Sequence, residues 1–199
     1  MRRNLVNLTC KHLRHWTRSL NITGSAFRQE SEHTMEQAVI YSPVGPLTLF
    51  AEDDFLTALV YGDYGGYDDI PLFREARRQL DEYFDGQRQT FHLPLRPEGT
   101  EFQKKVWQVL CRIPYGQVIS YRELATRVGA PRAFQAVGQA NGHNPLPILI
   151  PCHRVIAANG TLGGYSGGLE RKRFLLHLEG HDLPAPPAPR RRVLRGGVR

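Results

Sequence analysis

The sequence predicts an α+β protein made of two small domains, an N-terminal antiparallel sheet with one helix and a C-terminal helical domain. Short apolar segments separated by turn residues run from Ala38 to Tyr61, which is typical of strands. From Thr100 onward, apolar residues recur at helical spacing behind helix-start signals. The proline-flanked segment 94–97 lies between the two patterns, and 199 residues suffice for two such domains.

The predicted N-terminal domain covers residues 36–95. Three short strands are expected, at 39–41, 47–51 and 58–61. The turn Ser42-Pro43-Val44-Gly45 joins the first two strands. Pro71 opens a helix with one apolar face, and Asp85-Gly86 ends it. We also expect residues 90–93 to add an edge strand. No pattern in this domain points to chemistry.

The predicted C-terminal domain covers residues 96–183 and begins with three helices. A capping box at Thr100 starts the first, Ser120 starts the second, and the third spans about 132–141. The last two, joined by a tight glycine turn, resemble a helix-turn-helix, with an ordinary helical hairpin as the alternative. The third helix has unusually small side chains, which suit close approach to a nucleic-acid backbone. These are Ala133, Ala136, Gly138, Ala140 and Gly142.

The chain carries a net charge of +7, which favours a polyanionic partner such as nucleic acid. Basic ends inflate this total, because the part from Glu36 to Asp182 is closer to neutral. Residues 1–35 are interpreted as a disordered basic arm, with an organelle presequence or translation upstream of the true start, Met35, as alternatives. Residues 184–199 are predicted to be a disordered basic tail.

Three irregularly spaced cysteines make neither a disulfide framework nor a zinc motif, and they fit a reducing compartment. No apolar run approaches the roughly 18 residues of a membrane span. We expect a cytoplasmic protein if the source is bacterial, and a nuclear or organellar one if it is eukaryotic.

The most informative stretch runs from Pro147 to Val155, where Cys152 and His153 follow an apolar run fenced by two prolines. A buried cysteine is often inert, and apolar surroundings raise the pKa of its thiol. Glu179 could orient His153, which in turn could take the thiol proton. If the segment is extended, the two neighbouring side chains point to opposite faces and His153 reaches Cys152 only through a water molecule.

A glycine-rich segment at 159–168 follows, predicted to be a mobile loop or a close approach to a ligand, and then a final helix that ends at Glu179-Gly180. Together these segments resemble the O6-alkylguanine-DNA alkyltransferase family over residues 36–182. The motifs that carry the resemblance are Pro151-Cys152-His153-Arg154-Val155, Tyr115-Gly116-Gln117-Val118-Ile119-Ser120-Tyr121, Ala136-Val137-Gly138, Asn144-Pro145, Tyr165-Ser166-Gly167-Gly168 and Glu179-Gly180-His181.

The resemblance implies a ribonuclease H-like N-terminal domain and a winged helix-turn-helix-like C-terminal domain that carries the active site. It implies that Cys152 attacks the alkyl carbon on guanine O6, with His153 and Glu179 as the relay. Tyr121 would protonate the leaving purine, and Asn144 would brace the turn before Cys152. Further expected roles are guanine binding by Val155, Tyr165 and Ser166, a structural role for Arg154, and DNA contact by Tyr121, Phe134, Gln135, Ala136 and Gly138.

The implied function is direct-reversal repair of double-stranded DNA containing O6-alkylguanine, and also O4-alkylthymine, by a monomer. The nucleotide must be flipped out through the minor groove, because its target atom is inaccessible inside a duplex. The thioether product is stable, so each molecule should act once, without a metal or cofactor. Alternatives are a protein that binds alkylated guanine without repairing it, a cysteine hydrolase, and a basic winged-helix regulator.

Gln135 departs from the family pattern, in which an arginine precedes Ala136 and replaces the flipped base in the stack. Glutamine can hydrogen-bond the orphaned base but brings no charge and no guanidinium plane. Phe134 could act as an apolar wedge. The interpretation favoured by sequence alone is that Phe134 is a core residue on the inner face of the helix.

Overall fold

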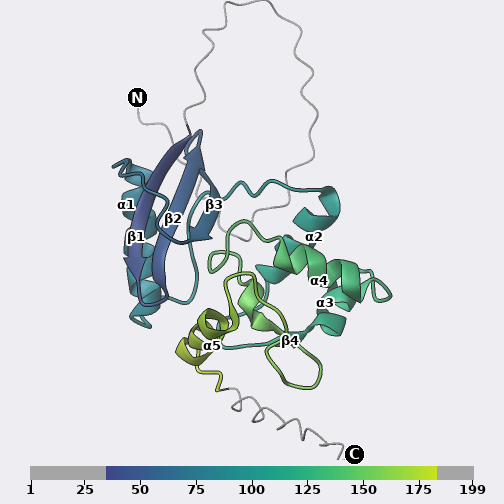
Figure 1. Ribbon diagram of the computed structural model, residues 1–199. Helices are drawn as coiled ribbons and strands as arrows, with labels where there is room; N and C mark the ends of the chain where they lie inside the picture. The colour runs from purple at the N-terminus through teal and green to yellow at the C-terminus, as the bar shows by residue number, and fades with distance from the viewer. Residues whose placement is uncertain (1–34, 183–199) are drawn as a thin grey trace, which may run out of the picture.

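The computed structural model describes residues 35–182 and has the predicted α+β architecture, with a three-stranded sheet followed by a helical domain (Figure 1). The expectations for the basic arm and for the tail fall almost wholly outside these residues. The elements in chain order are β1 (Glu36–Ser42), β2 (Gly45–Glu52), β3 (Phe55–Tyr61), α1 (Pro71–Phe84), α2 (Glu101–Leu110), β4 (Ile119–Ser120), α3 (Tyr121–Val128), α4 (Phe134–Gly142), a 3₁₀ turn (Cys152–Arg154), β5 (Val155–Ile156) and α5 (Leu169–Leu178).

The N-terminal sheet is antiparallel with strand order β1-β2-β3. Gly45 begins β2 with φ 95°, a conformation that glycine adopts without the cost of a side chain. The helix α1 packs against this sheet, and Pro71 occupies its first turn, where a missing N–H costs nothing. Leu47, Leu49 and Leu80 are fully buried and lie in the core between sheet and helix.

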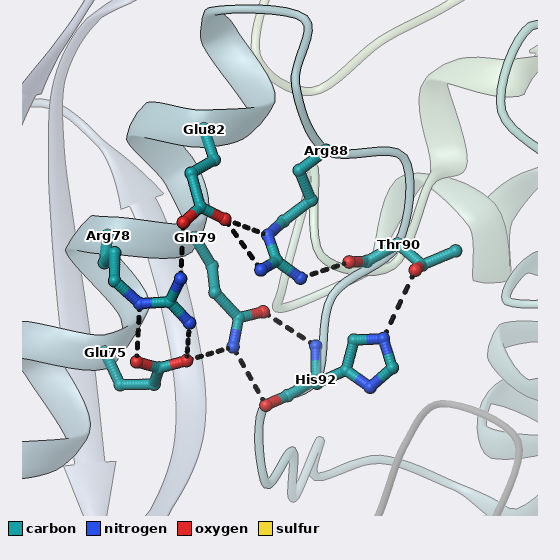
Figure 2. A network of polar contacts seen from close by, with 7 residues as sticks. All are labelled: Glu75, Arg78, Gln79, Glu82, Arg88, Thr90 and His92. Carbon is teal, nitrogen blue, oxygen red and sulfur yellow. Dashed lines mark hydrogen bonds and ion pairs between the residues drawn. The ribbon is translucent and has the colours of Figure 1, made fainter.

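The edge strand expected at residues 90–93 is absent, so that prediction is wrong. The side chain of Gln79 on α1 binds both backbone groups of His92: the His92 N–H donates to Gln79 Oε1 at 2.7 Å, and Gln79 Nε2 donates to the His92 carbonyl at 3.0 Å (Figure 2). A side chain therefore satisfies the hydrogen bonds that a neighbouring strand would have made. The sheet edge is met two residues later, where Leu95 forms an isolated parallel bridge with Leu56.

The C-terminal domain contains the predicted helices α2, α3 and α4, which pack on one another. The capping box of Thr100 and Gln103 is present at the start of α2. Ser120 caps α3, and Gly129 ends that helix in the left-handed conformation. Buried Trp107 on α2 donates its indole N–H to the Ala140 carbonyl of α4 at 2.9 Å.

Two short parallel strands place the end of the cysteine segment beside the start of α3. Ile119 in β4 pairs with Val155 in β5. The helix α5 packs on the 3₁₀ turn at Cys152–Arg154, and the buried apolar residues of both halves of the chain form one continuous cluster. Within the described range, no helix is long and apolar enough to span a bilayer.

Candidate active site

Cys152 lies in a 3₁₀ turn, not in the extended segment that the sequence suggested. The turn forms because the Arg154 N–H donates to the Pro151 carbonyl at 3.1 Å, which closes one short hydrogen-bonded loop directly after the proline. The side chains of Cys152 and His153 therefore do not alternate between opposite faces as they would in a strand. The Cys152 thiol is free and the residue is 1% exposed.

The turn before Cys152 is held by Asn144. Its amide Nδ2 donates to the Ile150 carbonyl at 2.8 Å, and its Oδ1 accepts from the Leu146 N–H at 3.1 Å. Between these two contacts, buried Ile148 adopts φ 72°, which is rare and strained for a β-branched residue. Such a conformation persists only where its surroundings enforce it, so the backbone leading to the thiol is fixed.

Glu179 is the polar centre of the site. Its carboxylate accepts from His153 Nε2 at 2.9 Å, from Arg154 Nε and Nη2 at 2.8 Å each, and from the Tyr83 hydroxyl at 2.8 Å. Burial alone would raise the pKa of this carboxyl group, but hydrogen bonds from His153 and Arg154 outweigh burial and lower it to about 2. Glu179 is therefore ionised at neutral pH.

The contact with Glu179 selects the tautomer of His153. Since the carboxylate only accepts, Nε2 carries the proton and Nδ1 is left with its lone pair. Nδ1 is buried and has no hydrogen-bond partner among the residues described. Burial also lowers the pKa of the His153 imidazole, which keeps the ring neutral and able to accept a proton.

The environment of Cys152 acts on its thiol in two directions. Burial raises the pKa of the thiol, while the Asn144 amide, the positive charge of Lys172 and the Tyr165 hydroxyl lower it. Burial is the larger influence, so the resting group is the neutral thiol. A buried thiol next to a neutral imidazole that is oriented by a carboxylate can lose its proton on demand and act as a nucleophile.

Lys172 is a site residue that sequence reasoning missed. Its fully buried ammonium donates to the carbonyls of Val155 at 2.6 Å, Leu162 at 2.5 Å and Gly164 at 3.2 Å. Burial lowers the pKa of Lys172 to about 8, so it is mostly charged at neutral pH and its three N–H groups match three acceptors. The only signal for this residue in the sequence was its place between two arginines, before the apolar end of the last helix.

Tyr121, the first residue of α3, lies between α4 and the glycine-rich loop. Its hydroxyl donates to the Gly164 carbonyl at 3.3 Å. A side chain at Gly163 would come within 3.0 Å of the ring, and one at Gly138 would contact it at 3.6 Å. Two of the glycines therefore leave room for Tyr121, which is a structural reason for small residues that the sequence did not reveal.

The three residues expected to bind guanine differ in their exposure and in their hydrogen bonds. Tyr165 is half-buried, and its hydroxyl is 2.7 Å from the hydroxyl of Tyr61 on β3. Ser166 is exposed. The Val155 N–H donates to the Cys152 carbonyl, and the Val155 carbonyl accepts from Lys172 at 2.6 Å.

Helix α4 presents Phe134, Gln135 and Ala136 to solvent. Phe134 is 50% exposed, so its interpretation as a core residue is wrong. Val137, Ala140 and Asn141 are the buried residues of this helix, whereas Phe134 is its first residue and stays exposed there. The role of Phe134 as an apolar wedge stays a prediction.

Within residues 35–182, no group of three His, Cys, Asp or Glu side chains is placed to bind a metal ion.

Comparison with known families gives two matches that cover both domains. Residues 101–181 match the family described as "6-O-methylguanine DNA methyltransferase, DNA binding domain". Residues 35–97 match "6-O-methylguanine DNA methyltransferase, ribonuclease-like domain".

Individual relatives agree. The methylated-DNA--protein-cysteine methyltransferase of Methanosarcina barkeri is 48% identical, and the match covers 73% of this chain and 97% of that protein. The constitutive enzyme of Bacillus subtilis is 47% identical, covering 69% and 91%.

Solved structures with the same architecture come from Mycobacterium tuberculosis. Its O6-methylguanine methyltransferase is 45% identical with a TM-score of 0.69, covering 77% of this chain and 97% of that one. Its OGT protein in complex with DNA is 47% identical with a TM-score of 0.67, covering 72% and 92%. The buried Cys152 with its His153–Glu179 pair, the fold and these matches agree, and the chain belongs to the methylated-DNA--protein-cysteine methyltransferase family of DNA repair proteins.

Proposed function

We propose that this protein removes the alkyl group from O6-alkylguanine in double-stranded DNA by transferring it irreversibly to Cys152. The observation that carries the proposal is the buried free thiol of Cys152 next to His153, whose Nε2 is held by Glu179 and whose Nδ1 is free to accept a proton. No step in this chemistry regenerates the thiol, so each molecule reacts once.

The reaction balances with the groups at hand. The thiol proton passes through a water molecule to His153 Nδ1 as the sulfur attacks the alkyl carbon. A carbon–sulfur bond forms, the bond from that carbon to guanine O6 breaks, and the bonding pair leaves with guanine. Tyr121 donates a proton to the leaving purine and regains one from solvent or from His153. Burial raises the pKa of Tyr121, which keeps the phenol protonated until the purine takes charge.

We also propose roles for the other expected site residues. Val155, Tyr165 and Ser166 hold the extruded base, and O4-alkylthymine is a second substrate. Asn144 keeps the turn that presents the thiol, and Arg154 anchors Glu179.

DNA engagement falls to α4. Its exposed residues Phe134, Gln135 and Ala136 enter the minor groove, with Gly138 and Tyr121 behind them. The protein would act as a monomer of two domains divided at residues 95 and 96, in the compartment that holds the DNA, which in a bacterium is the cytoplasm.

The test is a titration of the protein against excess duplex carrying O6-methylguanine, with the remaining lesion measured after hydrolysis. We expect the loss of lesion to stop at one methyl group per protein molecule. A second round of repair by the same molecules would contradict irreversible transfer. The same duplex with unmodified guanine is the control for non-specific loss.

Gln135→Arg is expected to strengthen duplex engagement. An exposed arginine at this position of α4 adds a charge for the phosphates and a plane that can stack in place of the flipped base. The affinity for lesion duplex at fixed salt should rise by roughly tenfold, with a matching gain in repair rate below saturation.

Transfer from free O6-benzylguanine is the internal control, because that substrate needs no flipping and its rate should not change. Gln139→Arg, further along the same exposed face, separates a general charge effect from one specific to position 135. Unchanged affinity and duplex rate in Gln135→Arg would show that this residue does not limit flipping.

A further inference from the structure

Tyr61, the last residue of β3, reaches from the N-terminal domain to the wall of the proposed guanine pocket. Its hydroxyl lies 2.7 Å from the hydroxyl of Tyr165, and the two rings meet edge to face with their centres 6.2 Å apart. Tyr61 and Tyr165 are 104 residues apart in the chain. The contact therefore joins the domain without evident chemistry to the loop beside Cys152.

The backbone of that loop is shaped to receive the Tyr61 ring. A side-chain carbon at Gly167 would lie 2.4 Å from Cε2 of Tyr61 and 2.8 Å from Cε1 of Tyr165, distances that real Cβ atoms do not adopt. The two tyrosines thus close over Gly167, and the glycine is needed here for close approach more than for flexibility.

Arg171 completes the contact from the other side. Its guanidinium stands 4.8 Å from the centre of the Tyr61 ring, a cation–π distance. It also donates to the carbonyl of Val44, in the turn between β1 and β2, at 2.9 Å and to the carbonyl of Gly167 at 2.8 Å. Loop, sheet and α5 are therefore tied together at Tyr61.

We propose that Tyr61 is a positioning residue for alkyl transfer, which acts by fixing the Tyr165 hydroxyl and the backbone at Gly167. The inference rests on the proposed function of Tyr165 and Cys152. Burial raises the pKa of the Cys152 thiol, and the Tyr165 hydroxyl is one of the groups that lower it. A Tyr165 ring freed from Tyr61 would spend less time in the orientation that the flipped base and the thiol require.

A double-mutant cycle tests this: Tyr61→Phe, Tyr165→Phe and the double variant, each assayed in single-turnover repair at saturating O6-methylguanine duplex. We expect Tyr61→Phe to slow transfer about two- to tenfold, as loss of one neutral hydrogen bond predicts. Duplex affinity should stay at the value of the unmutated protein, and the melting temperature should fall by only about 2–4 °C, because one hydrogen bond is lost. Tyr67→Phe is the matched control, since Tyr67 lies on the same domain and is 80% exposed.

The double variant decides the mechanism. If Tyr61 acts through Tyr165, the double variant transfers no more slowly than Tyr165→Phe alone. An unchanged rate in Tyr61→Phe, or losses that multiply in the double variant, would overturn the proposal. In either of those cases, normal repair by the unmutated protein would leave the proposed function standing. Absence of any Cys152 adduct in the unmutated protein would remove both the proposed function and the role of Tyr61.

Discussion

Glu179→Gln is expected to lower both the stability of the fold and the rate of alkyl transfer. Arg154, which is 6% exposed, loses the counter-charge to which it makes two hydrogen bonds. Leaving a buried charge unpaired costs about 3–5 kcal/mol, which is the fall expected in the free energy of unfolding at pH 7. The glutamine also no longer fixes the His153 tautomer, so the transfer rate should drop by roughly a hundredfold or more.

The pH dependence of stability gives this prediction a signature. The Glu179 carboxyl has a pKa of about 2 in the fold against an ordinary value of 4.5, which corresponds to roughly 3 kcal/mol. Because the folded-state pKa is the lower one, this stabilisation is present above pH 4.5 and is lost as the pH falls toward 2. Urea unfolding at pH 7, 5, 4 and 3 should show it for the unmutated protein and not for Glu179→Gln.

The matched control is Glu170→Gln, an exposed acid on the first turn of the same helix α5. We expect its stability and transfer rate to stay close to those of the unmutated protein. If Glu179→Gln and Glu170→Gln behaved alike, the carboxylate at 179 would not be the centre of the site.

Cys152→Ser is expected to abolish alkyl transfer while leaving the fold and DNA binding intact. Serine is nearly isosteric at this buried position, but its hydroxyl ionises far less readily than a thiol and is a much weaker nucleophile. Single-turnover transfer from O6-methylguanine duplex should fall by roughly a thousandfold or more. Binding of the same duplex, measured by fluorescence anisotropy, should stay within about twofold, because we propose that α4 and not the cysteine contacts the DNA.

A serine variant that kept measurable transfer would mean that another side chain accepts the alkyl group. A variant that lost duplex binding as well would mean that Cys152 has a structural role in presenting α4. Melting temperature distinguishes this second case from simple unfolding.

The sequence was sufficient for the elements whose signals are local. The capping box at Thr100, the cap at Ser120 and the glycine turn at Gly129 specify α2 and α3 within a few residues of chain, and these helices form as predicted. The His153–Glu179 contact was also foreseen, from chemistry and family resemblance together.

Contacts between distant segments were not readable in the same way. Gln79 replaces a strand at His92, and Tyr83 and Tyr61 reach the site from elements with no chemical motif. Lys172 stands between two arginines in the sequence, yet its ammonium is enclosed by the carbonyls of Val155, Leu162 and Gly164, which only the folded chain brings near. Such partners depend on tertiary packing, and a single sequence carries no signal for them.

Phe134 on α4 shows the same limit of prediction from sequence. Its apolar side chain predicts burial by composition, but Val137 and Ala140 already fill the inner face of α4. Which of several apolar residues faces inward depends on the neighbouring helices. The exposure of Phe134 next to Gln135 was therefore learned from the structure and not from the sequence.

The most direct test of alkyl transfer to Cys152 is intact mass with peptide mapping, after incubation with excess O6-methylguanine duplex and, separately, with free O6-benzylguanine. We predict a gain of one methyl or one benzyl group per molecule, confined to the peptide that contains Cys152. An adduct from the free base alone would place a defect in DNA engagement, at Gln135. Binding of the lesion duplex without any adduct from either substrate would contradict alkyl transfer and leave a protein that recognises alkylated guanine without repairing it.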